Sequence, residues 1–195
     1  SGGACQFEDL YRDFQREGLA SMRFFCFRTE PGGGRGVRPD ALAQQLAAIP
    51  ALRYHDGDAW QDHTNWGEGF TGGGADDLYS AIQQPVTQES WNQWGDFTKV
   101  VAGAGIQALI HTQTEEAIDG RLQQLERVER EVSIRPLRWA LMHMEGVTES
   151  QIERLRDLNV FIAVHPREMV TGGLLHRVHG DKAFAMPPLR EIQDS

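Results

Sequence analysis

Two histidines end two short apolar segments of the chain. His111 closes the run that begins at Ile106, and His143 closes the run that begins at Arg138. The two histidines are 32 residues apart, close to the roughly 31 residues of one strand-and-helix unit in a parallel eight-stranded barrel. Apolar runs of this kind are typical of strands buried on both faces, and their carboxyl ends meet at one edge of the sheet. Because imidazoles at such an edge are common metal ligands, the pattern indicates a metal site.

A third histidine, His165, follows the apolar run of residues 160–164. A lone histidine at a strand end is more often a hydrogen-bonded core or rim residue than a ligand, but three in successive units make the metal interpretation equally strong. Glu115 begins the helix after His111 and is a candidate for a supporting contact, with helix capping as its alternative role. Trp66 is a candidate for lining a substrate pocket, and packing is its alternative role.

The elements that must position these histidines alternate along the chain. From Thr87 onward, apolar periodicity, capping residues and glycine stops predict helices and strands in strict alternation. The helices are expected over 87–102, 115–131, 148–158 and 188–195, and the strands over 106–111, 138–143 and 160–165. Such alternation predicts parallel strands joined by crossover helices.

The N-terminal half has a weaker pattern. It predicts a helix over 7–14, a buried strand over 22–28, a helix over 41–49 and a strand that begins near 52–54. Residues 55–76 mix His, Asp, Trp and Gly with little periodicity, so we expect either a functional loop or a plain surface loop. His176 and His179 follow Gly172-Gly173, and we expect them in an exposed loop rather than in a metal site.

Composition bounds the class of protein. The 195 residues fit one domain over 1–195, and the formal charge of −9 argues against nucleic acid or an anionic membrane as partner. The two cysteines form no CxxC and indicate no disulfide framework, which favours a reducing, cytoplasmic location. All apolar stretches fall short of the roughly 20 residues of a membrane span. We therefore expect a small-molecule substrate or a protein partner, with a homo-oligomer possible.

Three segments resemble the amidohydrolase superfamily, in the subgroup of N-substituted formamide deformylases. They are Ala104–His111 with Ala117–Asp119, Arg138–His143, and Val147–Leu158 with Val160–Pro166, followed by a similar approach to the last strand over 181–195. The similarity runs in order from about residue 1 to 195. It implies an α/β fold of the (β/α)8 TIM-barrel type. This barrel is expected to be incomplete, because the chain starts as if just after a strand and stops where another strand should follow.

The resemblance also implies a ligand set and a reaction. His111 and His143 correspond to the metal ligands of the fifth and sixth strands, and Glu68 resembles the acidic ligand of the fourth. The implied cofactor is a divalent metal, which we expect to be zinc. The implied reaction is hydrolysis of a C–N bond in a small, non-peptide amide by a metal-activated water. His165 and Trp66 are then candidates for contacting the substrate. Glu115 is a candidate for contacting the metal ligands rather than the ion itself.

Departures from the family pattern support a different interpretation. The His-x-His pair of the first strand and the Asp that acts as base on the eighth strand are absent, so no catalytic base is assigned. Met142 stands where a Glu commonly precedes the second histidine, Thr114-Glu115 replaces Gly-Asp, and His165 replaces Gln. The alternative is a non-catalytic barrel fragment or an interaction module that needs a partner chain to complete its fold.

Overall fold

The computed structural model describes residues 7–28, 47, 49, 53–67, 78–79, 86–165 and 168–195. The strands in these ranges pair in parallel and in chain order. A first sheet contains β1 (Phe24–Arg28) and β2 (Gln61–Trp66), and a second contains β3 (Leu109–Thr112), β4 (Ala140–His143) and β5 (Phe161–Val164). A parallel bridge between Trp66 and Ala108 links β2 to the approach to β3.

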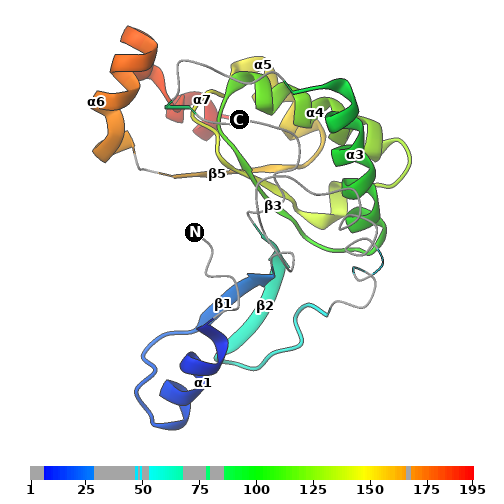
Figure 1. The fold of residues 1–195 in the computed structure, drawn as a ribbon, viewed down its shortest axis with the longest axis vertical. Helices are drawn as coiled ribbons and strands as arrows, with labels where there is room; N and C mark the ends of the chain where they lie inside the picture. The colour runs from blue at the N-terminus through cyan, green and yellow to red at the C-terminus, as the bar shows by residue number, and fades with distance from the viewer. Residues whose placement is uncertain are drawn as a thin grey trace.

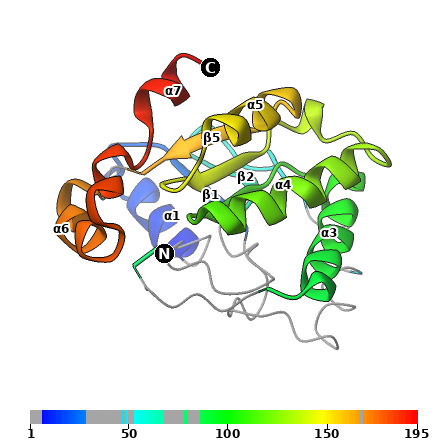
Figure 2. The same ribbon diagram turned by 90° about the horizontal axis from the view of Figure 1, so that it is seen from above.

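Three helices cross over between the strands of the second sheet or lead into it. They are α3 (Gln88–Gly103), α4 (Glu115–Glu129) and α5 (Glu149–Asp157), and they lie along one side of the sheet (Figures 1 and 2). Each begins after a threonine, Thr87, Thr114 or Thr148, whose hydroxyl accepts a hydrogen bond from the backbone N–H three residues later. These N-caps satisfy donors that a helix start leaves unpaired, so they define where each crossover begins.

The core lies between these helices and the sheet. The helix α4 contributes a fully buried apolar stripe, and β3 and β4 each contribute a fully buried residue to the same cluster: Ile118, Leu122, Leu125, Ile110 and Leu141. Trp139, also fully buried, donates its indole N–H to the carbonyl of Ile106 at 2.8 Å, which satisfies its polar atom inside the core. The apolar runs before His111 and His143 are therefore core strands, as their sequence predicts.

Two peripheral parts flank this core. The helix α1 (Glu8–Arg16) lies against β1 and β2, and the helix α6 (Glu168–His179) stands beyond the end of β5 (Figure 1). The segment of α6 is tied to residues 78–79 by a hydrogen bond between the Tyr79 and Thr171 hydroxyls at 3.0 Å and by one from His179 Nε2 to the Leu78 carbonyl at 2.6 Å. The chain ends with η4 (Gly180–Ala185) and α7 (Leu189–Gln193), and η3 (Arg135–Leu137) precedes β4.

The predicted alternation from Thr87 onward is confirmed as a parallel α/β arrangement. The closed (β/α)8 barrel and the single-domain boundary stay predictions. None of the helices in the described ranges is long and apolar enough to cross a membrane. Residues 41–49 lie almost entirely outside the described residues, with only positions 47 and 49 included.

Four expectations need correction. Residues 55–76 were expected as one loop, but β2 lies within them, because backbone pairing with β1 outweighs the weak local pattern. Arg53 and Tyr54 do not form the expected strand. His176 and His179 lie on α6, since Gly172-Gly173 is tolerated inside that helix. Cys26 is buried and disulfide-bonded, so the expectation of no disulfide is wrong.

Candidate metal centre

Three imidazoles gather where the strands of the second sheet end. His111 is the third residue of β3, His143 is the last residue of β4, and His165 directly follows β5. The ring centroids of His111 and His143 are 4.4 Å apart, and those of His143 and His165 are 5.3 Å apart, with the rings edge to face in both pairs. The three rings therefore form a row along the carboxyl edge of the sheet, with His143 in the middle.

The proximity of His111 and His143 requires a departure from regular strand geometry. In the ladder, His111 pairs with Met142, and His143 pairs with Thr112. Because side chains alternate along a strand, a regular β4 would direct His143 to the face opposite His111. His143 instead has a φ of 75°, and the Met144 N–H donates to the Met142 carbonyl at 3.1 Å across it, as in a γ-turn. This turn ends β4 and redirects the His143 ring toward His111.

The backbone strain continues for a second residue. Met144 has a φ of 61°, so two successive non-glycine residues occupy the left-handed region. Such conformations cost of order 1–3 kcal/mol each and cluster at functional sites, where the surrounding structure imposes them. Here the Met144 N–H also donates to the Thr112 carbonyl at 2.9 Å, which anchors the turn to β3. The placement of the His143 ring is therefore imposed by tertiary contacts rather than by local preference.

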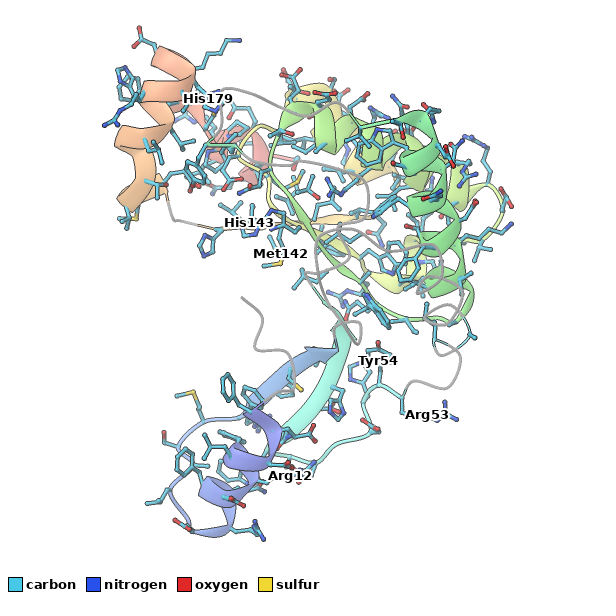
Figure 3. All side chains as sticks on the ribbon, in the orientation of Figure 1. Arg12, Arg53, Tyr54, Met142, His143 and His179 are labelled. Atoms are coloured by element: carbon cyan, nitrogen blue, oxygen red, sulfur yellow. The ribbon has the colours of Figure 1, made fainter. Side chains whose placement is uncertain are left out.

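The loop after His143 is held by close backbone contact with the loop after β3. The Gly146 N–H donates to the Gln113 carbonyl at 2.8 Å. A Cβ at position 146 would lie 2.8 Å from the Glu115 nitrogen and 2.9 Å from the Gln113 oxygen, so only glycine fits there. Figure 3 shows His143 beside Met142 at the end of the sheet that faces α6. The two loops together fix the edge on which the imidazoles lie.

The His111 and His143 pair fits a shared metal ion. Two imidazoles bound to one tetrahedral zinc, each through a nitrogen about 2.0–2.1 Å from the ion, have ring centroids about 5 Å apart. The observed 4.4 Å is close to that separation. Within the described ranges, however, no group of three or more His, Cys, Asp or Glu residues is arranged to hold a metal ion. The pair could thus supply two ligands, and His165 extends the row without completing a three-residue set.

The remaining candidate site residues are Glu68, Trp66 and Glu115. Glu68 lies outside the described residues. Trp66 is buried at the end of β2. Its ring packs edge to face on Phe97 of α3, with the ring centroids 6.0 Å apart. Glu115 is exposed in the first turn of α4, where its backbone carbonyl accepts a hydrogen bond from the Gln151 side chain at 3.0 Å. The position of Glu115 in the first turn of α4 fits the helix-start alternative, and the ring contact of Trp66 supports the packing alternative. The roles of both residues toward a metal or a substrate stay predictions.

The residues just after His143 carry no functional prediction from the sequence. Glu145 is fully buried only two residues beyond that ligand candidate. A buried carboxylate needs compensating partners and is costly otherwise, so its position there is unusual. The sequence does contain a clue, since Met-Glu-Gly over residues 144–146 places a charged residue between an apolar one and a glycine directly after a predicted buried strand.

Two solved structures resemble this chain in fold. One is an uncharacterized metal-dependent hydrolase from Pyrococcus horikoshii OT3, with a TM-score of 0.64 and 17% identity, and the other is an uncharacterized metal-dependent hydrolase from Pyrococcus furiosus, with 0.65 and 16%. Each match covers 96% of this chain but only 37% and 38% of the respective hydrolase chain. No protein-family model and no curated protein matches. At these identities the likeness shows the fold alone.

Proposed function

We propose that this chain carries part of the metal centre of a metal-dependent hydrolase. The observation that carries the proposal is the 4.4 Å separation of the His111 and His143 rings at the carboxyl edge of parallel strands. In parallel α/β folds this edge is where ligands bind. The shared fold with two proteins described as metal-dependent hydrolases supports the same interpretation. This chain spans less than two-fifths of the length of those two proteins. Hydrolysis by a complete enzyme is therefore itself a proposal.

His111 and His143 are the residues that would hold the ion, each through one imidazole nitrogen. A divalent ion bound there would lower the pKa of a bound water toward about 7 and polarise a substrate carbonyl. The γ-turn at His143 fixes the direction of that ring, and the contact of Gly146 with Gln113 holds the turn. Zinc is the proposed metal, because it accepts imidazole and carboxylate ligands together. Glu68 is the proposed third ligand.

The proposed substrate is a small molecule with a hydrolysable C–N bond of the amide type. His165 is exposed beside His143, so its ring is available to donate a hydrogen bond to a substrate oxygen or to a leaving nitrogen. The described residues near the row provide no carboxylate that we assign as catalytic base. The C–N bond specificity rests on the sequence resemblance described above.

The competing proposal is a non-catalytic module that completes its fold with a partner chain. It is favoured by β5, whose Phe161 and Val164 are 45% and 36% exposed although they lie in a parallel strand. Parallel sheets are normally covered on both faces, and an open apolar edge is usually covered by association. Light scattering distinguishes the two proposals in part, because a monomer that binds one equivalent of metal argues against a module that needs a partner.

The test of the proposed function is hydrolysis of a panel of small N-acyl and N-formyl amides by protein loaded with Zn²⁺ or Mn²⁺. We expect turnover that depends on the metal and is lost in His111→Asn and in His143→Asn. Asparagine is chosen because it tolerates the left-handed backbone at position 143. His176→Asn on α6 is the matched control and should keep activity. Turnover that survives in both site variants would show that hydrolysis occurs elsewhere.

A further inference from the structure

The helix α6 has an attached face and an outer face. The attached face consists of residues four positions apart, namely Thr171, Leu175 and His179. The hydroxyls of Thr171 and Tyr79 are 3.0 Å apart, His179 Nε2 is 2.6 Å from the Leu78 carbonyl oxygen, and Leu175 is fully buried. Because residues i, i+4 and i+8 lie on one side of a helix, these contacts fix the side of α6 that meets the rest of the protein.

The outer face of α6 is exposed and largely apolar. It consists of Met169, Val170, Gly173, Leu174 and Arg177. Met169 and Val170 are 89% and 88% exposed, and Leu174 is 41% exposed. Phe184 of η4, 81% exposed, extends this face, because its ring centroid is 5.2 Å from that of the exposed His176. Large apolar side chains gathered on one surface mark an interaction site, and Figure 1 shows α6 at the margin of the molecule, beyond β5.

The exposed apolar area of the outer face matches one half of a protein dimer interface. From the exposed fractions of its apolar side chains and Phe184, this face offers roughly 500 Å² to solvent, at about 150–200 Å² for a fully exposed large side chain. A standard interface buries about 800 Å² on each partner, of which about 55–65% is apolar. This share is roughly 450–520 Å². The outer face therefore has the apolar area that a stable dimer needs.

Gly173 lies in the middle of the outer face. A Cβ at this position would meet nothing within 4 Å, so no contact among the described residues requires a glycine there. Glycine inside a helix is unfavourable relative to alanine, because its backbone loses more freedom on folding. What a glycine at this position provides is a flat helix surface that the backbone of a second helix can approach closely.

We propose that the outer face of α6 joins two copies of this chain in a dimer with twofold symmetry. The two α6 helices run antiparallel and cross at Gly173, so that glycine meets glycine and the apolar side chains on either side pack together. A twofold interface uses the same surface on both copies and closes on itself, which suits a single apolar face. At this crossing, Val170 of one copy lies level with His176 and Arg177 of the second copy.

The dimer contact is separate from the proposed metal centre. It uses α6 and η4, whereas His111 and His143 belong to β3 and β4. It also differs from completion of the sheet by a partner chain, because it leaves the open edge of β5 as it is. Loss of the dimer and loss of metal binding are therefore distinguishable results.

The first test is light scattering of the full chain after gel filtration at about 100 µM, well above the micromolar Kd of weak interfaces of this size. We expect a mass twice that of one chain. Val170→Lys should weaken dimerisation at least about tenfold, because the added cation lies level with Arg177 and like charges across an interface repel. Val170→Glu should dimerise at least about tenfold more tightly than Val170→Lys. Since Val170 is 88% exposed, both variants should keep the fold of the single chain.

The second test compares the two neighbouring glycines of α6. Gly173→Ala should weaken dimerisation at least about tenfold, because two added methyl groups meet at the crossing, while urea unfolding of the monomer shows no loss of stability. Gly172→Ala is the matched control, since a Cβ there also meets nothing within 4 Å but the residue is half-buried on the other side of the helix. It should keep the dimer.

A second exposed apolar region provides the control for the choice of surface. Leu10 on α1 is 51% exposed, and Leu10→Lys should leave the dimer intact. A wild-type chain that is monomeric at about 100 µM would overturn the proposal. A dimer that persists unchanged in Val170→Lys and Gly173→Ala, or one that is lost in Leu10→Lys, would equally contradict a contact through α6. Tighter dimerisation of Val170→Lys than of Val170→Glu would contradict the antiparallel crossing.

Discussion

Replacing Gly146 by alanine is expected to disturb the candidate metal centre through the loop that follows His143. The added Cβ would lie 2.8 Å from the Glu115 nitrogen and 2.9 Å from the Gln113 oxygen, and both are backbone atoms that cannot rotate away. Relieving such overpacking costs about 1–3 kcal/mol. The movement also weakens the 2.8 Å hydrogen bond from the Gly146 N–H to the Gln113 carbonyl, which contributes about 1 kcal/mol. We therefore expect a loss of about 2–4 kcal/mol in unfolding free energy.

The assay is urea unfolding followed by tryptophan fluorescence, with Zn²⁺ affinity measured in parallel by equilibrium dialysis. The loop that moves contains the turn at His143, so Gly146→Ala should weaken metal binding as well as the fold. Gly172→Ala is the matched control, because a Cβ there meets nothing within 4 Å, and glycine to alanine inside a helix stabilises by roughly 0.5–1 kcal/mol. An unfolding free energy of Gly146→Ala within about 0.5 kcal/mol of the wild type would refute the close-contact reasoning.

Three further changes test the elements that support the site. Trp139→Phe leaves the buried Ile106 carbonyl without its 2.8 Å donor, and we expect a cost of about 1–3 kcal/mol in urea unfolding, whereas no loss would mean that the bond is unimportant. Thr148→Ala removes the capping box shared with Gln151 and should cost about 1 kcal/mol, which thermal unfolding measures. Arg154→Leu breaks two ion pairs to acidic residues of α4. It should cost less than about 1 kcal/mol and nothing at 1 M salt, and a salt-independent loss would contradict a screened surface pair.

The sequence predicts the C-terminal part of the fold well because its local patterns agree with its tertiary contacts. The caps Thr87 and Thr148 and the apolar runs before His111 and His143 each identify an element that the structure contains. The parallel order then follows from the alternation of these elements. The proximity of the two histidines was likewise expected from the shared edge of parallel strands.

The geometry that brings the two rings together was beyond sequence reasoning. Regular alternation would place His143 on the face opposite His111, and the left-handed backbone at His143 and Met144 corrects this. The residue types do not predict that turn, because a hydrogen bond from the Met144 N–H to the Thr112 carbonyl of β3 imposes it. Gly146 was the available clue, since a glycine soon after a buried strand often marks a close approach of two backbones.

The N-terminal half was harder to predict for a related reason. The strand β2 contains Gln61, Asp62 and His63, residue types that rarely indicate a strand. It pairs with β1, and the His63 ring is hydrogen-bonded to Asp56 and Glu8. Similarly, Gly172 and Gly173 suggested a loop, whereas the ties from α6 to Leu78 and Tyr79 accompany a continuous helix. Both features depend on residues distant in sequence.

The most direct test of the metal centre is an NMR titration of the full chain with Zn²⁺, following the imidazole ¹⁵N resonances of all seven histidines. We expect the rings of His111 and His143 to respond together and to reach saturation at the same metal concentration, while His55 and His176 do not change. A response of only one of these two rings, or of other histidines in their place, would contradict a shared ion.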